Sequence, residues 1–186
     1  QYKNEVEEAL VNYFGRSAVK RGNKAFDVHE TSYHVEADVA AFFQHRRYVS
    51  NGTYFEGVEL RTDKDGSRVI NWPEQHYENG VSKNKDTATR FKSIVRILKA
   101  LSNEMTEKGV RAGDIPGFFI ECLVYNITND HFGNYSYTAD VKAALVFVYE
   151  NTKTEEACRE WVEVSGLKWL FRPSQKWTRE QANAFT

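Results

Sequence analysis

The sequence predicts an α+β protein with a strand-rich first half and a helical second half. Strands are predicted where apolar and polar residues alternate, as on the two faces of a strand. Helices are predicted where apolar residues recur every three or four positions. The polar stretch 73–86 is predicted to be a loop that crosses between the two halves. We expect a partial mixed or antiparallel sheet in residues 1–75 and a helical domain in residues 86–186.

The composition fits an ordinary globular protein. Its 186 residues are 41% hydrophobic and 27% charged, with a net charge of −1. A net charge this small does not attract nucleic acid to the protein as a whole, so a basic binding site would have to be a local cluster of residues. Cys122 and Cys158 lack metal-ligand spacing, and we expect them to be reduced, as in a cytoplasmic protein. No apolar run is long enough for a membrane span. The chain opens on Gln1, which suggests an excised fragment.

The first half begins with a predicted helix over residues 2–14. Residues 17–21 and 24–28 follow as two short strands joined by Gly22-Asn23, which permits a tight turn. This region is therefore expected to be small-stranded and antiparallel.

A second hairpin is predicted from residues 52–61 and 68–72, joined by the turn signal of residues 63–66. A calcium-binding loop is excluded here, because Arg68 stands where such a loop needs glycine and Pro73 interrupts it.

The chain between these hairpins carries the first candidate functional residue. In residues 35–39, Glu36 and Asp38 alternate with apolar residues that we expect to face a core. The run then turns wholly apolar to Phe43, as in a strand covered on both faces. Arginines follow in residues 44–48, so a metal and phosphates could meet near Asp38. On the strand alone, an exposed carboxylate without a role is the simpler interpretation.

The helical half begins at Thr87 or Thr89 as N-cap. Its first helix carries a basic stripe that is either solvated or in contact with phosphate, formed by Lys92, Arg96 and Lys99. The next helix, residues 118–127, is apolar almost all round except for Glu121, which should pair with a cation of the stripe. Backbone N–H groups of Gly117 and Phe118 at its start could meet a phosphate.

Later helices are predicted over residues 139–150 and 155–161. A short apolar segment follows at 167–171, and Thr178 is expected to cap a last helix.

Three of these stretches, in this order, resemble nucleotidyltransferases of the DNA polymerase β-like superfamily. The stretches are residues 35–39, 90–99 and 115–123. The resemblance is to the branch containing oligoadenylate synthetase, cyclic GMP–AMP synthase and the bacterial second-messenger synthetases of antiphage systems. Residues 71–73 and 168–171 also resemble bacterial members.

The resemblance implies roles for individual residues. Asp38 would be the third carboxylate of a two-metal site for Mg²⁺ or Mn²⁺. Lys99 would reach the triphosphate of the donor nucleotide, and Arg96 and Lys92 would support it electrostatically. Phe118 stands where the family often stacks a tyrosine on the donor base. Gly117 departs from the family, whose members commonly place there a serine that touches the triphosphate. Asp38, Lys99 and Phe118 should therefore face one cleft.

The family also places a Gly-Ser signature and two aspartates ahead of the region that begins here. We therefore expect these 186 residues alone to be inactive. We expect the parent protein to be a metal-dependent nucleotidyltransferase that makes a cyclic or linear oligonucleotide messenger from nucleoside triphosphates.

Two alternatives remain open. One is an enzyme that adds nucleotides to an RNA end, which the near-neutral charge disfavours. The other is a non-catalytic module that binds nucleotide or protein. The partial sheet should also expose an edge, through which two copies could pair.

Overall fold

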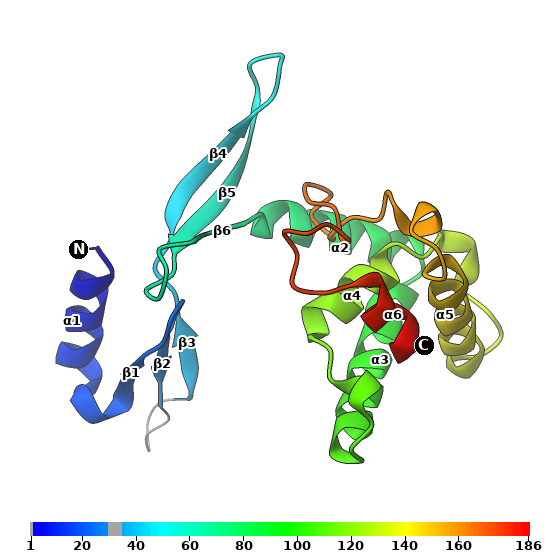
Figure 1. Ribbon diagram of the computed structural model, residues 1–186, viewed down its shortest axis with the longest axis horizontal. Coiled ribbons are helices and arrows are strands. Elements are labelled where there is room, and N and C mark those ends of the chain that lie inside the picture. Colours follow the sequence, from blue (N-terminus) through cyan, green and yellow to red (C-terminus); the bar gives the residue numbers. More distant parts are fainter. Residues whose placement is uncertain (1, 30–34) are drawn as a thin grey trace. The chain divides into compact units, whose positions relative to one another are not determined.

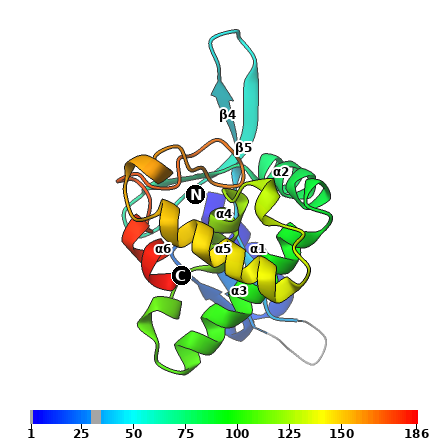
Figure 2. The same cartoon turned by 90° about the vertical axis from the view of Figure 1, so that its right-hand side faces the viewer.

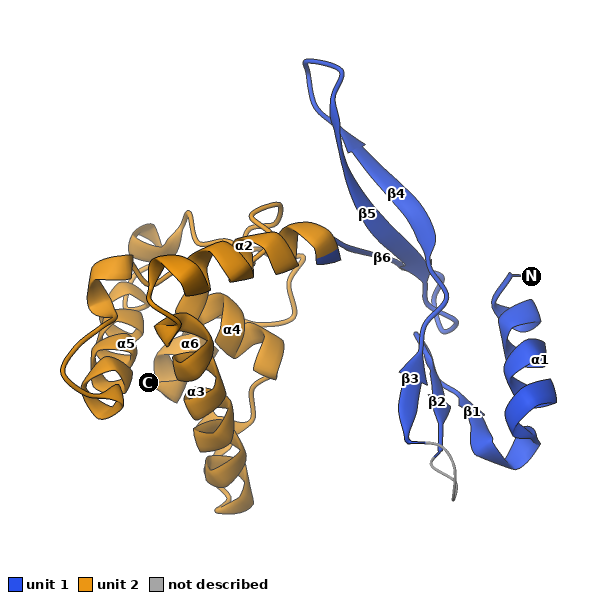
Figure 3. Cartoon of the chain, turned by 180° about the vertical axis from the view of Figure 1, so that it is seen from behind, with its two compact units in different colours: residues 1–73 blue, residues 74–186 orange. Residues whose placement is uncertain are grey.

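The computed structural model describes residues 2–29 and 35–186, and the chain divides into two compact units, residues 1–73 and 74–186 (Figure 3). A helix and two three-stranded sheets form the first unit, and helices form the second. The α+β class expected from the sequence is therefore confirmed.

The first sheet is built against the N-terminal helix. Helix α1 (Tyr2–Phe14) packs beside β1 (Val19–Arg21), which pairs in antiparallel fashion with β2 (Phe26–Val28). Strand β3 (Ala37–Val39) pairs with the other side of β2. Alternate side chains of β1 and β2 are buried, and the ring of Phe26 is completely enclosed. The short hairpin predicted around residues 22 and 23 is thus confirmed.

The second sheet is a long antiparallel hairpin with a third strand (Figure 1). It consists of β4 (Phe43–Tyr48), β5 (Tyr54–Arg61) and β6 (Arg68–Asn71). Gly57 lies directly under the buried ring of Trp72. A side chain at position 57 would collide with that ring. The predicted hairpin of residues 52–72 is confirmed.

The expected continuous strand over residues 35–43 is wrong. It divides into β3 and β4, which belong to different sheets. Val35 is 84% exposed and Phe43 is 54% exposed, so this apolar run is not covered on both faces. The physical reason is that β3 is an edge strand, paired only with β2 among the described residues. An apolar pattern shows which residues favour burial, but not whether a neighbour is there to bury them.

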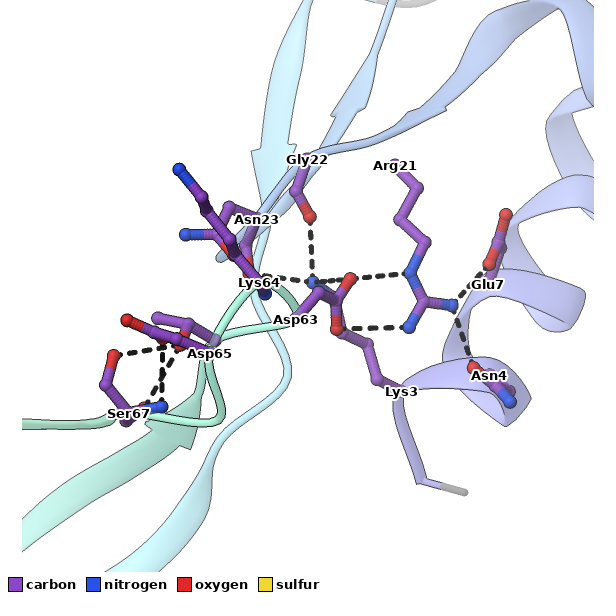
Figure 4. Close-up of polar contacts among 11 residues, drawn as sticks. Lys3, Asn4, Glu7, Arg21, Gly22, Asn23, Asp63, Lys64, Asp65 and Ser67 are labelled. Atoms are coloured by element: carbon purple, nitrogen blue, oxygen red, sulfur yellow. Dashed lines mark hydrogen bonds and ion pairs between the residues drawn. The ribbon is translucent and has the colours of Figure 1, made fainter.

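Ion pairs tie the parts of the first unit together (Figure 4). The guanidinium of Arg21 donates to both carboxylate oxygens of Asp63, at 2.7 and 3.1 Å, and to Glu7 of α1 at 2.7 Å. Lys3 reaches the same Asp63 carboxylate at 2.9 Å. Because Asp63 lies in the turn between β5 and β6, these contacts connect that turn to α1 and β1.

Five α-helices form the second unit, which Figure 2 shows with α5 toward the reader. They are α2 (Pro73–Asp86), α3 (Arg90–Glu107), α4 (Gly117–Tyr125), α5 (Tyr137–Asn151) and α6 (Arg179–Phe185). Single 3₁₀ turns lie between them at Arg111–Gly113, Asn129–His131 and Glu156–Cys158. The predicted cap of the last helix is confirmed, because the Thr178 side chain accepts from the Gln181 backbone N–H.

The core of this unit joins the apolar face of α3 to α4. Phe91, Ile94, Val95 and Leu98 are buried, as their spacing predicts. Helix α4 adds buried residues around most of its circumference. Both cysteines are free and buried, in agreement with the prediction that they are reduced. Among the described residues, no helix is long and apolar enough to cross a bilayer.

The crossing loop predicted for residues 73–86 is wrong, because this segment is helix α2. Pro73 suits the first turn of a helix, where its missing N–H costs nothing. Asn79 of this helix donates through Nδ2 to the Val164 carbonyl at 2.9 Å. Its neighbour Gly80 is buried near Phe91 and Val164. Tertiary contacts therefore stabilise a helix whose own sequence is polar. The helix predicted for 155–161 is also wrong in extent, since only one 3₁₀ turn forms.

Two glycine substitutions should have opposite effects on stability. In Gly57→Ala the new Cβ would lie 2.6 Å from the Trp72 ring and 2.7 Å from the Asn71 carbonyl, so β6 must shift. We expect a loss of about 1–3 kcal/mol in the free energy of unfolding. In Gly80→Ala the nearest atom is 3.8 Å away, and helix propensity should add up to about 1 kcal/mol. Urea denaturation measures both; equal effects of the two changes would contradict this packing.

The Asp63 network should make the first unit sensitive to acid. Hydrogen bonds from Arg21 and then Lys3 lower the pKa of Asp63 from 3.8 to about 2. A folded-state pKa below the unfolded value stabilises the protein above the ordinary pKa, and this contribution is lost as pH falls through about 2. Because Asp63 is 34% exposed, we expect only about 1 kcal/mol.

Asp63→Asn should therefore speed amide hydrogen exchange in residues 19–28 at pH 6, while wild type and variant converge toward pH 2. The exposed helix carboxylate Glu8, replaced as Glu8→Gln, is the matched control and should follow wild type at both values. A difference between Asp63→Asn and wild type that persists undiminished at pH 2 would show that the network does not depend on this charge.

Candidate functional site

The residues predicted for the site lie in both units. Asp38 belongs to the first unit, and the cationic and aromatic candidates belong to the second. That these residues face one shared cleft stays a prediction.

Asp38 lies in the middle of the short strand β3 and is exposed. Its cross-strand partner is Asp27 of β2, a residue that sequence reasoning missed. Side chains of directly opposed residues emerge on the same face, so two carboxylates repel each other there and a cation would stabilise them. The described residues hold no group of three side chains fit for a metal ion. On their own they do not make up a two-metal site, which needs more oxygen ligands.

The basic stripe follows one face of α3. Arg96 is exposed, while Lys92 and Lys99 are half-buried. The Lys99 amino group lies 3.1 Å from the Glu121 carboxylate of α4. The predicted pairing of Glu121 with a cation of this stripe is thus confirmed.

The Glu121 carboxylate has a second partner that the sequence reading missed. His76 Nε2 of helix α2 lies 3.4 Å from Glu121 Oε1, whereas Lys99 binds Oε2. Hydrogen bonds from His76 and then from Lys99 lower the pKa of Glu121 to about 2, although burial opposes this. Glu121 therefore stays ionised at neutral pH. His76 was missed because its segment was expected to be a loop; the Pro73 helix-start signal could have revealed it.

Phe118 lies at the start of α4, where it is 39% exposed. The His76 ring is stacked on it, with centroids 5.5 Å apart and planes at 27°. Trp177 packs against it as well, at 5.5 Å and 40°. Trp177 in turn is stacked on the buried Phe119 at 5.4 Å and 13°. Phe118 is thus the exposed member of an aromatic cluster anchored in the core.

Gly117 leaves space for the Lys99 side chain. A Cβ at position 117 would lie 3.3 Å from Lys99 Cε and 3.4 Å from Cδ, so the methylene stem passes over this glycine. A serine here would press against that stem. Glycine at this position is therefore consistent with the observed path of Lys99 toward Glu121.

Together these residues place a cation and an exposed aromatic ring at the start of one helix. Lys99 offers an amino group to an anion, and Phe118 offers the exposed part of an aromatic ring. Gly117, Phe118 and Glu121 all lie in the first turns of α4, which fixes the two features relative to each other. A ligand that carries both an aromatic ring and phosphate groups matches this arrangement.

Comparison with known proteins identifies the family of the chain. Residues 78–186 match the model of the cGAS/DncV-like nucleotidyltransferase C-terminal helical domain. The cyclic dipyrimidine nucleotide synthase CdnE of Cecembia lonarensis is 43% identical over 187 residues, which cover 100% of this chain and 63% of that protein. The synthase of the same description from Legionella pneumophila is 40% identical, with 100% and 62% covered.

Solved structures give the same result. The CdnE cyclic dinucleotide synthase of Elizabethkingia meningoseptica, solved with GTP and Apcpp, superposes with a TM-score of 0.89 at 37% identity, covering 98% of this chain and 66% of that one. The CdnE c-UMP-AMP synthase of Rhodothermus marinus gives 0.85 at 31% identity, covering 99% and 62%. The chain spans less than two thirds of the length of these relatives.

The family match covers more than half of the chain, and the order of elements agrees with it. The chain therefore belongs to the cGAS/DncV-like nucleotidyltransferases, and residues 78–186 are their C-terminal helical domain.

Proposed function

We propose that this chain acts as part of a nucleotidyltransferase that joins nucleoside triphosphates into a cyclic dinucleotide second messenger. The observation that carries the proposal is that the Lys99 amino group binds Glu121 of α4, three residues along that helix from the exposed Phe118 ring. Relatives that match the whole chain at 43% and 40% identity are cyclic nucleotide synthases, which supports the same reaction class.

In this proposal the helical unit holds the donor nucleotide. Phe118 stacks on the base, and Lys99 contacts the triphosphate with electrostatic support from Arg96 and Lys92. A fixed cation lowers the barrier to phosphoryl transfer because it stabilises charge that develops on the phosphate oxygens. Gly117 contributes at most its backbone N–H, since its lack of a side chain leaves room for the Lys99 stem.

Asp38 is proposed as a carboxylate for a divalent ion, Mg²⁺ or Mn²⁺. The described residues do not complete such a site, so its remaining ligands must come from elsewhere in the working protein. For this reason we expect the 186 residues by themselves to be inactive. The reaction would take place in the cytoplasm, where nucleoside triphosphates are available, and antiphage signalling is the proposed setting.

The relatives also suggest a base preference. Those at 43% and 40% identity are described as cyclic dipyrimidine synthases, whereas the Elizabethkingia meningoseptica relative at 36% is described as a cyclic dipurine synthase. We therefore expect UTP or CTP to be used in preference to GTP.

A non-catalytic nucleotide-binding module is the second candidate. The observation that favours it is that Asp27 and Asp38 alone cannot hold two metal ions. Such a module would keep the Lys99 and Phe118 contacts and bind nucleotides without turnover.

Turnover of labelled ATP, GTP, CTP and UTP by the full-length protein with Mg²⁺ or Mn²⁺ separates the two. We expect a cyclic product, with Asp38→Asn and Lys99→Met each lowering kcat/KM by about 100-fold or more, because each removes a charge that stabilises the transition state. Glu8→Gln is the control and should retain activity. Nucleotide binding without any product would support the module, and product undiminished in Asp38→Asn would remove Asp38 from the site.

A further inference from the structure

His76 connects the two features that the proposed function assigns to nucleotide binding. Its Nε2 atom lies 3.4 Å from Glu121 Oε1, and its ring is stacked on Phe118. His76 comes from α2, whereas Phe118 and Glu121 are three residues apart on one face of α4. One imidazole therefore touches both the aromatic surface and the carboxylate that holds Lys99.

The two oxygens of Glu121 are divided between two donors. Lys99 binds Oε2 at 3.1 Å, and His76 Nε2 lies next to Oε1. An anion paired with Lys99 weakens the attraction of that amino group for phosphate. A carboxylate that is also held by His76 cannot turn both oxygens toward Lys99.

We propose that His76 is a positioning residue for nucleotide binding, acting through Glu121 on Lys99 and directly on Phe118. By bonding to Oε1, His76 keeps Glu121 from turning both oxygens toward Lys99. The ion pair with Glu121 is then weaker, and the Lys99 amino group stays available to the triphosphate. By stacking on Phe118, it fixes the ring that receives the base. This inference rests on the proposed function and adds a residue to the same site.

The charged groups in contact with this imidazole are identified by the geometry. Glu121 of α4 faces it directly, and Lys99 of α3 lies on the far side of that carboxylate. The His76 side chain is 26% exposed and that of Glu121 25%, so both are partly shielded from water. Their interactions are therefore stronger than those of a fully exposed pair.

Two substitutions of His76 separate its two contacts. His76→Phe keeps a ring on Phe118 but loses the hydrogen bond to Glu121. His76→Gln keeps a donor near Glu121 but loses the ring. Calorimetry on the full-length protein would measure the affinity for a non-hydrolysable UTP analogue and for UMP, and the ratio of the two affinities reports the triphosphate contact.

His76→Phe should lower the triphosphate-to-monophosphate ratio by about tenfold, the size expected for one hydrogen bond to a charged group. His76→Gln should keep that ratio and weaken both ligands by about threefold, because Phe118 is no longer held. Glu121→Gln should raise the ratio by about fivefold, because Lys99 loses its competing anion. Thermal unfolding would confirm that each variant is folded.

His131→Ala is the matched control. His131 also contacts a carboxylate, Asp130, and a phenylalanine ring, Phe147, elsewhere in the same unit. Its loss should leave both affinities unchanged.

An unchanged ratio in His76→Phe and in Glu121→Gln, with normal wild-type binding, would overturn the role of His76 and leave the proposed function standing. A wild-type protein that binds neither ligand would instead overturn the proposed function, and the role of His76 with it.

Discussion

The second unit depends on one partly buried carboxylate. Glu121 lies on α4, a helix that is otherwise almost wholly apolar and surrounded by the core. A charge in such a place is costly unless it is paired, and here the partners come from two other helices, His76 from α2 and Lys99 from α3. The requirement to pair this carboxylate brings together the cation and the aromatic ring at the start of α4. The proposed binding chemistry is thus a consequence of how the core tolerates a charge.

Much of this arrangement could be predicted from the sequence. The apolar spacing of α3 and the exceptional polarity of Glu121 within α4 were sufficient to predict both helices and the pairing of Glu121 with a cation of the basic stripe. Helix α2 could not be predicted in the same way, since its stability comes from Asn79 and Gly80 docking against distant residues. With α2 missed, His76 was missed too. Local periodicity in the sequence does not reveal contacts between residues that are far apart in the chain.

The first unit shows that the same limit of sequence patterns applies to strands. Its two hairpins were predicted, but strand β4 was not, and residues 35–43 divide between two sheets. Most of residues 35–43 are exposed, because a sequence pattern does not show whether a neighbouring strand is present to bury them. Asp27 was overlooked as the partner of Asp38, since strand register is set by pairing and not by either strand alone. This unit is held together by the ion pairs of Asp63 with Arg21 and Lys3. They join residues that are far apart in the chain.

The close passage of the Lys99 stem over Gly117 has a consequence for sequence change in this family. Because a side chain at 117 would enter the space through which the Lys99 stem passes, the effect of a residue at 117 depends on which residue stands at 99. A Cβ at 117 would require the flexible Lys99 stem to move by a few tenths of an ångström. Positions 117 and 99 should therefore behave as an epistatic pair, in which the cost of a substitution at one position is set by the residue at the other.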